Sequence, residues 1–409
     1  MISPDVWDVI STLPNQIQSE HFIIHFGDRN PPRGRGLGVN GVRDRVLILT
    51  YLKALEGLYR AMTAPPWNWP LPLTDESKKT RVYVCDEDPA TNYDENNIPC
   101  VLLPSRSDEP TSHGELLRAA AEAVHEATHV FTFTHRPHQE TSSKPWIWFD
   151  EGLAVLMETM VSAGNPDYFR FLQNWIDMPE CSLDDPDERY QAGIFLNYLH
   201  QRLGPEFIKQ VWTQSDLGEG PIEALERFSA LRNLTFLSAN PTVQDLFGSG
   251  YCVDPFFMWD HRSVAMAPDI FFRFGERAIS QSFFLASNTK SEVNEDMLDH
   301  LSCRYYRFNL ASDVSSVKID MLVEGPCEET KLKAEVAIVD LERQRERIVA
   351  LKRAQNSPDG TAGLLSENIT VSNGIHHLVL VVSNCGKKAR GDGEMHDDGK
   401  SFHISAVAQ

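Results

Sequence analysis

The sequence lacks long apolar runs and is poor in basic residues relative to acidic ones. No stretch approaches 18 uninterrupted apolar residues, which excludes a membrane-spanning helix. There are 38 Lys and Arg residues against 58 Asp and Glu residues, which gives a formal net charge of -20. Such an acidic surface repels nucleic acid phosphates and anionic lipid headgroups. We therefore expect neither nucleic acid nor a membrane as a partner.

Cysteine is also scarce, and secretory features are missing. The seven cysteines are odd in number and include no CxxC pair, so neither a disulfide scaffold nor a thiolate zinc site is indicated and we expect thiols. Near the N-terminus, Asp5 and Asp8 stand where a signal peptide has basic residues and then a long apolar run. We expect a cytoplasmic protein from the sequence as given, or a secreted one if a leader has been removed. The oligomeric state is left open.

The N-terminal third has the pattern of a mixed α/β region. Residues Glu20 to Phe26 and Thr80 to Cys85 are rich in β-branched and aromatic side chains, as in strands. Residues Arg43 to Met62 carry apolar side chains at helical spacing. Residues Cys100 to Leu103 are expected to form a short strand at the edge of a sheet.

The pattern changes after about residue 275. Short alternating runs follow one another and are separated by turn-rich pieces, which is typical of an antiparallel β-sandwich. No internal repeat is present. We therefore predict an α+β protein with a first domain over residues 1–275 and a β-sandwich accessory domain over residues 276–409.

The pentapeptide His125-Glu126-Ala127-Thr128-His129 carries the chemistry. A helix is expected here, because Ser112 and Glu115 have the spacing of a capping box and an apolar face follows. At i and i+4 the two imidazoles lie one turn apart on one helix face, where both can bind a single zinc ion. Glu126 stands beside them and can take a proton from a water that the ion activates.

A catalytic zinc ion needs a third protein ligand, and two residues compete for that role. Glu151 lies in Trp148-Phe149-Asp150-Glu151-Gly152-Leu153-Ala154, at the start of a second predicted helix. His135 matches the spacing of HExxHxxGxxH, but Thr132 stands where that pattern needs a glycine to turn the chain. We prefer Glu151, and His135 remains as the alternative.

The two motifs together resemble the gluzincin superfamily of zinc metallopeptidases, also called the peptidase MA-like group. The resemblance covers about residues 18–215 and includes the segment Tyr190-Gln191-Ala192-Gly193-Ile194-Phe195-Leu196. It implies a thermolysin-like catalytic domain with a small β-sheet above the metal cleft and a helical lobe below it. It also implies that His125, His129 and Glu151 bind Zn²⁺ and that Glu126 is the general base and proton shuttle.

The chain departs from part of this family in a way that bears on specificity. Aminopeptidases of the group carry a G-x-M-E-N segment that binds the free amine of the substrate, and the chain has none. This favours an endopeptidase. Members of the group also place a Tyr or His beside the oxyanion that develops on the substrate. Tyr190 is our candidate for this second catalytic role, and His200 and Tyr251 stay open.

The sequence thus predicts a zinc-dependent peptidase that hydrolyses a polypeptide substrate with a metal-activated water. Two alternatives remain. One is a zinc hydrolase that uses His135 as its third ligand. The other is a non-catalytic protein that binds peptides or glycans on a peptidase scaffold, although the intact HExxH motif weighs against it.

Overall fold

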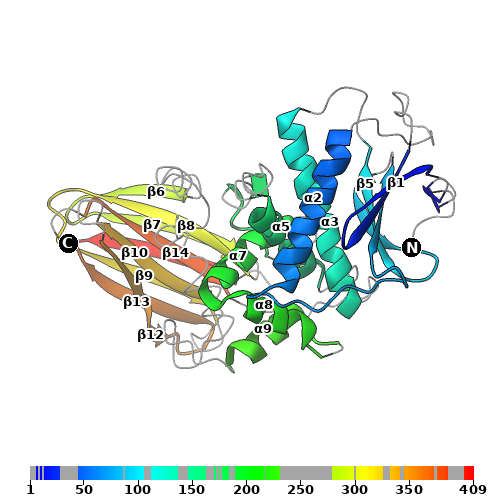
Figure 1. Cartoon of the computed structure of the whole chain (residues 1–409). Helices are drawn as coiled ribbons and strands as arrows, with labels where there is room; N and C mark the ends of the chain where they lie inside the picture. Colours follow the sequence, from blue (N-terminus) through cyan, green and yellow to red (C-terminus); the bar gives the residue numbers. More distant parts are fainter. Residues whose placement is uncertain are drawn as a thin grey trace. The chain divides into compact units, whose positions relative to one another are not determined.

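A computed structural model gives the fold of the chain (Figure 1). It describes residues 6–27, 45–105, 112–136, 146–162, 170–183, 189–230 and 279–409, apart from gaps at 8–9, 12, 86–87, 172–173, 175–176, 217, 299–300, 326–331, 341–344, 373–374 and 386–399. The chain divides into two compact units. Unit 1 contains residues 1–172 and 189–224, and unit 2 contains residues 173–188 and 225–409. The boundary predicted near residue 275 lies outside the described residues.

Unit 1 contains a five-stranded mixed sheet. Its strands are β1 (Asn15–Gln18), β2 (Phe22–Phe26), β3 (Thr80–Cys85), β4 (Ala90–Tyr93) and β5 (Pro99–Pro104), in the order β1-β2-β3-β5-β4. Strands β2, β3 and β5 are parallel, and β1 and β4 pair antiparallel at the two edges. The strand predicted over Cys100 to Leu103 therefore lies inside the sheet, because β4 covers its outer side. All of β5 except its last residue is buried, as an internal strand requires.

Helices pack beside this sheet in unit 1. They are α2 (Arg45–Thr63), α3 (His113–His135), α5 (Ile147–Val161), α7 (Ala192–Leu203) and α8 (Pro205–Thr213), with a short 3₁₀ turn η1 (Arg189–Gln191) before α7. Helix α9 (Pro221–Ala230) runs across the division between the units. Helix α3 contacts α2, α5, β4 and β5, so it is the central helix of the unit (Figure 1).

Unit 2 contains two further five-stranded sheets. The first has the order β11-β10-β14-β8-β6 and the second β12-β13-β9-β15-β7. All pairings among their described strands are antiparallel except that of β6 with β8. The strands are β6 (Ile279–Leu285), β7 (Lys290–Leu298), β8 (Ser302–Leu310), β9 (Ser316–Glu324), β10 (Leu332–Asp340), β11 (Arg345–Ala350), β12 (Lys352–Asn356), β13 (Ala362–Thr370), β14 (His377–Asn384) and β15 (Lys400–Ala408).

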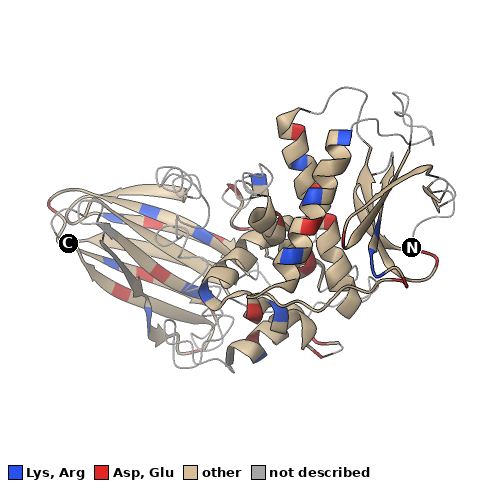
Figure 2. Cartoon of the chain, in the orientation of Figure 1, with Lys and Arg blue, Asp and Glu red and all other residues tan. Residues whose placement is uncertain are grey.

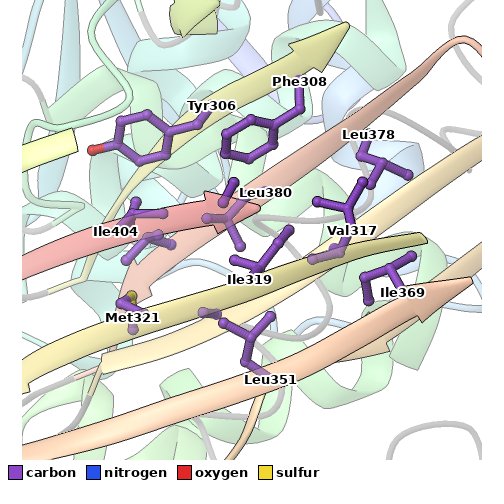
Figure 3. Close-up of a cluster of buried hydrophobic side chains, with 14 of the residues drawn as sticks. Tyr306, Phe308, Val317, Ile319, Met321, Leu351, Ile369, Leu378, Leu380 and Ile404 are labelled. Carbon is purple, nitrogen blue, oxygen red and sulfur yellow. The ribbon is translucent and has the colours of Figure 1, made fainter. Parts of the chain in front are cut away.

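One buried cluster joins the two sheets of unit 2. Tyr306, Phe308 and Leu380 from the first sheet meet Ile319 and Ile404 from the second (Figure 3). Strand β9 alternates buried and open positions along its length, as expected for a strand with one face toward a core. The fold is thus α+β, with an N-terminal mixed sheet and helices followed by two sheets of mostly antiparallel strands, as predicted at this level.

The charged residues, the helices and the cysteines of the structure can be compared with the expectations from composition. Lys and Arg lie among Asp and Glu on the described elements of both units (Figure 2). None of the described helices is long and apolar enough to cross a membrane. None of the five cysteines described by the structure forms a disulfide.

Candidate metal centre

Helix α3 places the two histidines of the HExxH motif. The predicted capping box begins it: the Ser112 backbone N–H donates to Glu115 Oε2 at 2.7 Å, and the Glu115 backbone N–H donates to Ser112 Oγ at 3.3 Å. The helix then continues without interruption to His135. Since His125 and His129 are four residues apart in it, their rings lie on one face, with centroids 5.1 Å apart.

Helix α5 supplies the carboxylates that face α3. It is apolar on almost every side, as expected for a helix buried all round. Its charged side chains are Asp150, Glu151 and Glu158, and the last two are seven residues apart on one face. Because α5 packs against α3, this face meets the two histidines. The helix begins four residues earlier than the predicted start at Glu151 and has no side-chain cap.

His125, His129 and Glu151 form a group that could hold a metal ion. One ligand atom from each lies within 4.8 Å of the others. Glu151 Oε2 lies 3.0 Å from His125 Nε2 and 3.8 Å from His129 Nε2. The three side chains are largely buried, with 12%, 8% and 15% of the His125, His129 and Glu151 side chains exposed.

The donor set and its spacing fit zinc. Two imidazole nitrogens and one carboxylate oxygen are ligands that zinc takes in catalytic sites. Two ligands that each lie about 2.0–2.1 Å from a tetrahedral ion are about 3.3 Å apart. The two distances from Glu151 Oε2, 3.0 and 3.8 Å, fall on either side of that value. Glu151 Oε2 is therefore already close to the spacing from both rings that the ion requires.

Two further carboxylates hold the other nitrogens of the rings. Glu158 Oε1 lies 2.6 Å from His125 Nδ1, and Asp150 Oδ2 lies 3.0 Å from His129 Nδ1. Both carboxylates belong to buried residues, with 4% exposed in each case. The Glu158 carboxylate at His125 Nδ1 favours a proton there and leaves Nε2 with a lone pair for a metal. Asp150 lies at ion-pair distance from His129 Nδ1, without the geometry of a hydrogen bond. Both rings thus turn Nε2 toward Glu151.

The electrostatics of the group favour a cation. Burial lowers the pKa of His129, but the carboxylates of Asp150 and Glu151 outweigh this and raise it to about 9. Burial likewise lowers the pKa of His125, while Glu151 and Glu158 raise it well above its usual range. The neighbouring carboxylates thus stabilise positive charge on both rings. A divalent cation can replace the protons that carry this charge.

Glu126 lies beside the candidate metal group and contacts the sheet. The residue is 9% exposed, and burial raises the pKa of its carboxyl group. Thr91 Oγ1 donates to the Glu126 backbone carbonyl and lies 3.1 Å from Glu126 Oε2. Thr91 belongs to β4, so the edge of the sheet touches the acid of the HExxH motif directly.

Tyr190 is close to the same group. It lies in η1, and its ring centroid is 5.8 Å from that of His125. The ring also stacks on Phe171, with centroids 5.2 Å apart and an interplanar angle of 19°. The sequence-predicted Tyr190 is therefore brought to the histidines, and its ring is held by an aromatic neighbour.

A close crossing of α5 and α7 explains this placement. A Cβ on Gly193 would stand 2.5 Å from Val155 Cγ1, and one on Gly152 would stand 3.0 Å from the carbonyl carbon of Ala192. Only glycine at both positions permits this approach. Since Gly152 follows Glu151 and η1 precedes α7, the crossing brings Tyr190 to the metal-binding group.

The other candidates from the sequence lie elsewhere. His135 is exposed at the end of α3, six residues after His129 in unbroken helix. A separation of six residues in a helix corresponds to a rotation of about 240° beyond one full turn and a rise of about 9 Å. The two histidines therefore point in different directions and cannot share an ion. His200 stacks on Trp67, with centroids 5.6 Å apart. Tyr251 lies outside the described residues.

Two functional contacts were missed from the sequence, for different reasons. The seven-residue spacing of Glu158 from Glu151 places both on one face of α5 and could have indicated its contact with His125. Thr91 gave no such signal, because only the packing of β4 on α3 brings it to Glu126.

Comparison with known proteins adds no evidence for a function. No family model matches the chain, and no curated protein matches it. Among solved structures, one match is a family GH115 4-O-methyl-alpha-glucuronidase with specificity for decorated arabinogalactans. It has a TM-score of 0.18 and 12% sequence identity, and the match covers 74% of this chain and 34% of that one. The chain thus spans about a third of that protein's length, and a match at this level carries no argument.

Proposed function

We propose that the protein is a zinc-dependent peptidase of the gluzincin type, and that it cleaves within polypeptides. The observation that carries the proposal is the convergence of His125, His129 and Glu151, with Glu126 between the two histidines in sequence. The alternative zinc site with His135 is disfavoured by the unbroken helix that carries His135 away from His129.

Each side chain then has one task. His125, His129 and Glu151 hold the ion, and Glu158 and Asp150 fix the two imidazole rings. When bound, zinc would lower the pKa of a water molecule and polarise the scissile carbonyl group. Glu126 would take a proton from the attacking water and return it to the leaving amine. Burial raises the pKa of Glu126, which suits a group that must hold this proton between the two steps.

Tyr190 would stabilise the negative charge that develops on the carbonyl oxygen. Its ring lies 5.8 Å from the ring of His125, and its stacking on Phe171 limits its movement. A phenol held in this way is oriented before the reaction begins, so it can donate a hydrogen bond without first having to reorient.

The position of β4 supports a polypeptide substrate. Among the described residues, β4 is the last strand of its sheet, and it lies along α3. An extended peptide can add to such an edge through backbone hydrogen bonds. A peptide paired in this way would pass beside Glu126. The lack of an amine-binding G-x-M-E-N segment favours cleavage inside the chain.

Metal content and peptide cleavage test the proposal together. We expect roughly one zinc ion per chain in the wild type and its loss, with cleavage, in Glu151→Ala. Glu126→Gln should keep the zinc but lower kcat by about 10²–10⁴-fold. Glu223→Ala, a change at an exposed residue of α9, is the control and should alter neither.

Three results would contradict the proposal. Wild-type protein that takes up no zinc after supplementation would remove the metal site. Full zinc occupancy in Glu151→Ala would move the third ligand elsewhere. Zinc-loaded protein that cleaves no member of a broad peptide library would leave a metal-binding protein without this activity.

A further inference from the structure

Thr91 occupies a junction between the sheet and the HExxH helix. It is the second residue of β4 and pairs with Val101 of β5, so its backbone is fixed within the sheet. Its side chain points to α3, and the residue is only 6% exposed. The orientation of Thr91 is therefore set by β4. This strand contacts Glu126 but carries none of the proposed metal ligands.

The Thr91 hydroxyl touches the same residue twice. Oγ1 donates to the backbone carbonyl of Glu126 and also lies 3.1 Å from Glu126 Oε2. Oγ1 carries one hydrogen, which these two acceptors share, so the contact holds the end of the glutamate side chain beside its own backbone carbonyl. This bridge favours one side-chain rotamer and turns Oε2 toward β4.

A buried general base gains from such a restraint. A free glutamate side chain has several rotamers, and ordering it costs conformational entropy. Proton transfer requires the carboxylate within hydrogen-bond reach of the attacking water, so misplaced rotamers are unproductive. With Oε2 held by Thr91, the second carboxylate oxygen of Glu126 is the one left to face the reacting water.

We propose that Thr91 is a positioning residue that fixes the carboxylate of Glu126 for proton transfer. The proposal rests on the proposed function, because it assigns Glu126 as the base. The hydrogen-bond contacts of the Thr91 hydroxyl go to Glu126 and not to the three proposed ligands. Its effect should therefore appear in kcat and in the placement of Glu126, and not in zinc content.

A purely structural role for Thr91 would look different. Threonine also suits a strand by its shape, and β4 could need only that shape to pack on α3. Thr91→Val keeps the shape and the strand preference but removes the hydroxyl. Thr91→Ser keeps the hydroxyl but loses a methyl group. The hydroxyl and the packing can thus be separated with these two variants.

The test compares zinc content, kcat, KM and crystal structures of zinc-loaded wild type, Thr91→Val and Thr91→Ser. We expect Thr91→Val to keep its zinc and lower kcat by about ten- to hundredfold, the range for a lost hydrogen bond to a charged group. Its KM should change by less than about twofold, since uniform binding is untouched. Thr91→Ser should recover most of the loss, and the Glu126 carboxylate should be displaced in Thr91→Val alone.

Several results would overturn the proposal. Wild-type kcat in Thr91→Val would do so, as would equal losses in both variants or loss of zinc from Thr91→Val. If the wild type cleaves no peptide, the proposed function fails, and the crystal structures alone decide the role of Thr91. A displaced Glu126 carboxylate in Thr91→Val would then support it, and an unchanged carboxylate would overturn it.

Discussion

Glu158 Oε1 lies 2.6 Å from His125 Nδ1, so His125 is held between two glutamates of one helix. Glu151 faces the other nitrogen of the same ring at 3.0 Å. The two glutamates are seven residues apart, which is about two turns of α5, and the imidazole ring lies between their carboxylates. The ring orientation is therefore set by α5 and not by α3, which carries the ring.

Removing the Glu158 carboxylate should weaken metal binding without removing a ligand. We expect Glu158→Gln to lower zinc affinity by about 10–100-fold, because the amide no longer fixes the Nδ1 proton as strongly. Competition with a chromophoric chelator measures this change. Glu223→Gln, at an exposed position of α9, is the matched control. Equal affinities in Glu158→Gln and the wild type would contradict a role for Glu158.

Tyr190→Phe should impair cleavage but not metal binding. The change keeps the ring that stacks on Phe171 and removes only the hydroxyl group. Loss of one donor to a developing oxyanion typically costs about 10²–10³-fold in kcat. Steady-state kinetics with a peptide substrate and elemental analysis of the same sample measure both effects. An unchanged kcat would assign the oxyanion to another group.

A side chain at Gly193 should force α5 and α7 apart. Its Cβ would stand 2.5 Å from Val155 Cγ1, so we expect Gly193→Ala to lower the free energy of unfolding by about 1–3 kcal/mol. Urea unfolding followed by tryptophan fluorescence measures this. Gly114→Ala is the control, since nothing lies within 4 Å of its Cβ. That change should be neutral or stabilising by up to about 1 kcal/mol.

Zinc affinity should rise with pH. The pKa of His129 is raised to about 9 in the metal-free protein, so the ring is protonated at pH 7 and zinc must displace the proton. Each proton released makes the affinity increase by about tenfold per pH unit below that pKa. Calorimetric titrations in buffers of different ionisation enthalpy count the protons. Zinc binding at pH 7 without proton release would contradict this prediction.

The metal-free protein should show the opposite trend in stability. The folded-state pKa of His129, about 9, lies above its usual value of 6.5. Its protonation therefore contributes stability that is fully present below pH 6.5 and is lost as pH rises through 9. Thermal unfolding with chelator at pH 6.5, 7.5 and 9 measures the loss. His129→Gln should remove this part of the pH dependence.

Local patterns predicted the elements of the metal group well. The HExxH spacing and the capping box placed His125 and His129 on one helix face, and the apolar run after Glu151 predicted α5. These features depend on side chains within a few turns of one helix. The absence of a glycine at Thr132 favoured Glu151 over His135, and the structure shows the helix running unbroken through Thr132 to His135.

What the sequence did not predict depends on contacts between distant segments. Strand β4 has only four residues, and its pairing with β5 makes it the edge instead of β5. Thr91 meets Glu126 across 35 residues of sequence. The partners of Asp150 and Glu158 likewise depend on how α5 packs against α3. No periodicity within a single segment carries this information.

The ligand set has a consequence for biosynthesis. His125, His129 and Glu151, together with Asp150 and Glu158, all come from α3 and α5, which lie between His113 and Val161. Translation proceeds from the N-terminus, so these groups leave the ribosome before residues 279–409 are made. The residues of the proposed metal site are thus synthesised before the C-terminal sheets. On the proposed function, zinc supply during synthesis, and not only after release of the finished chain, would therefore decide how much protein is loaded.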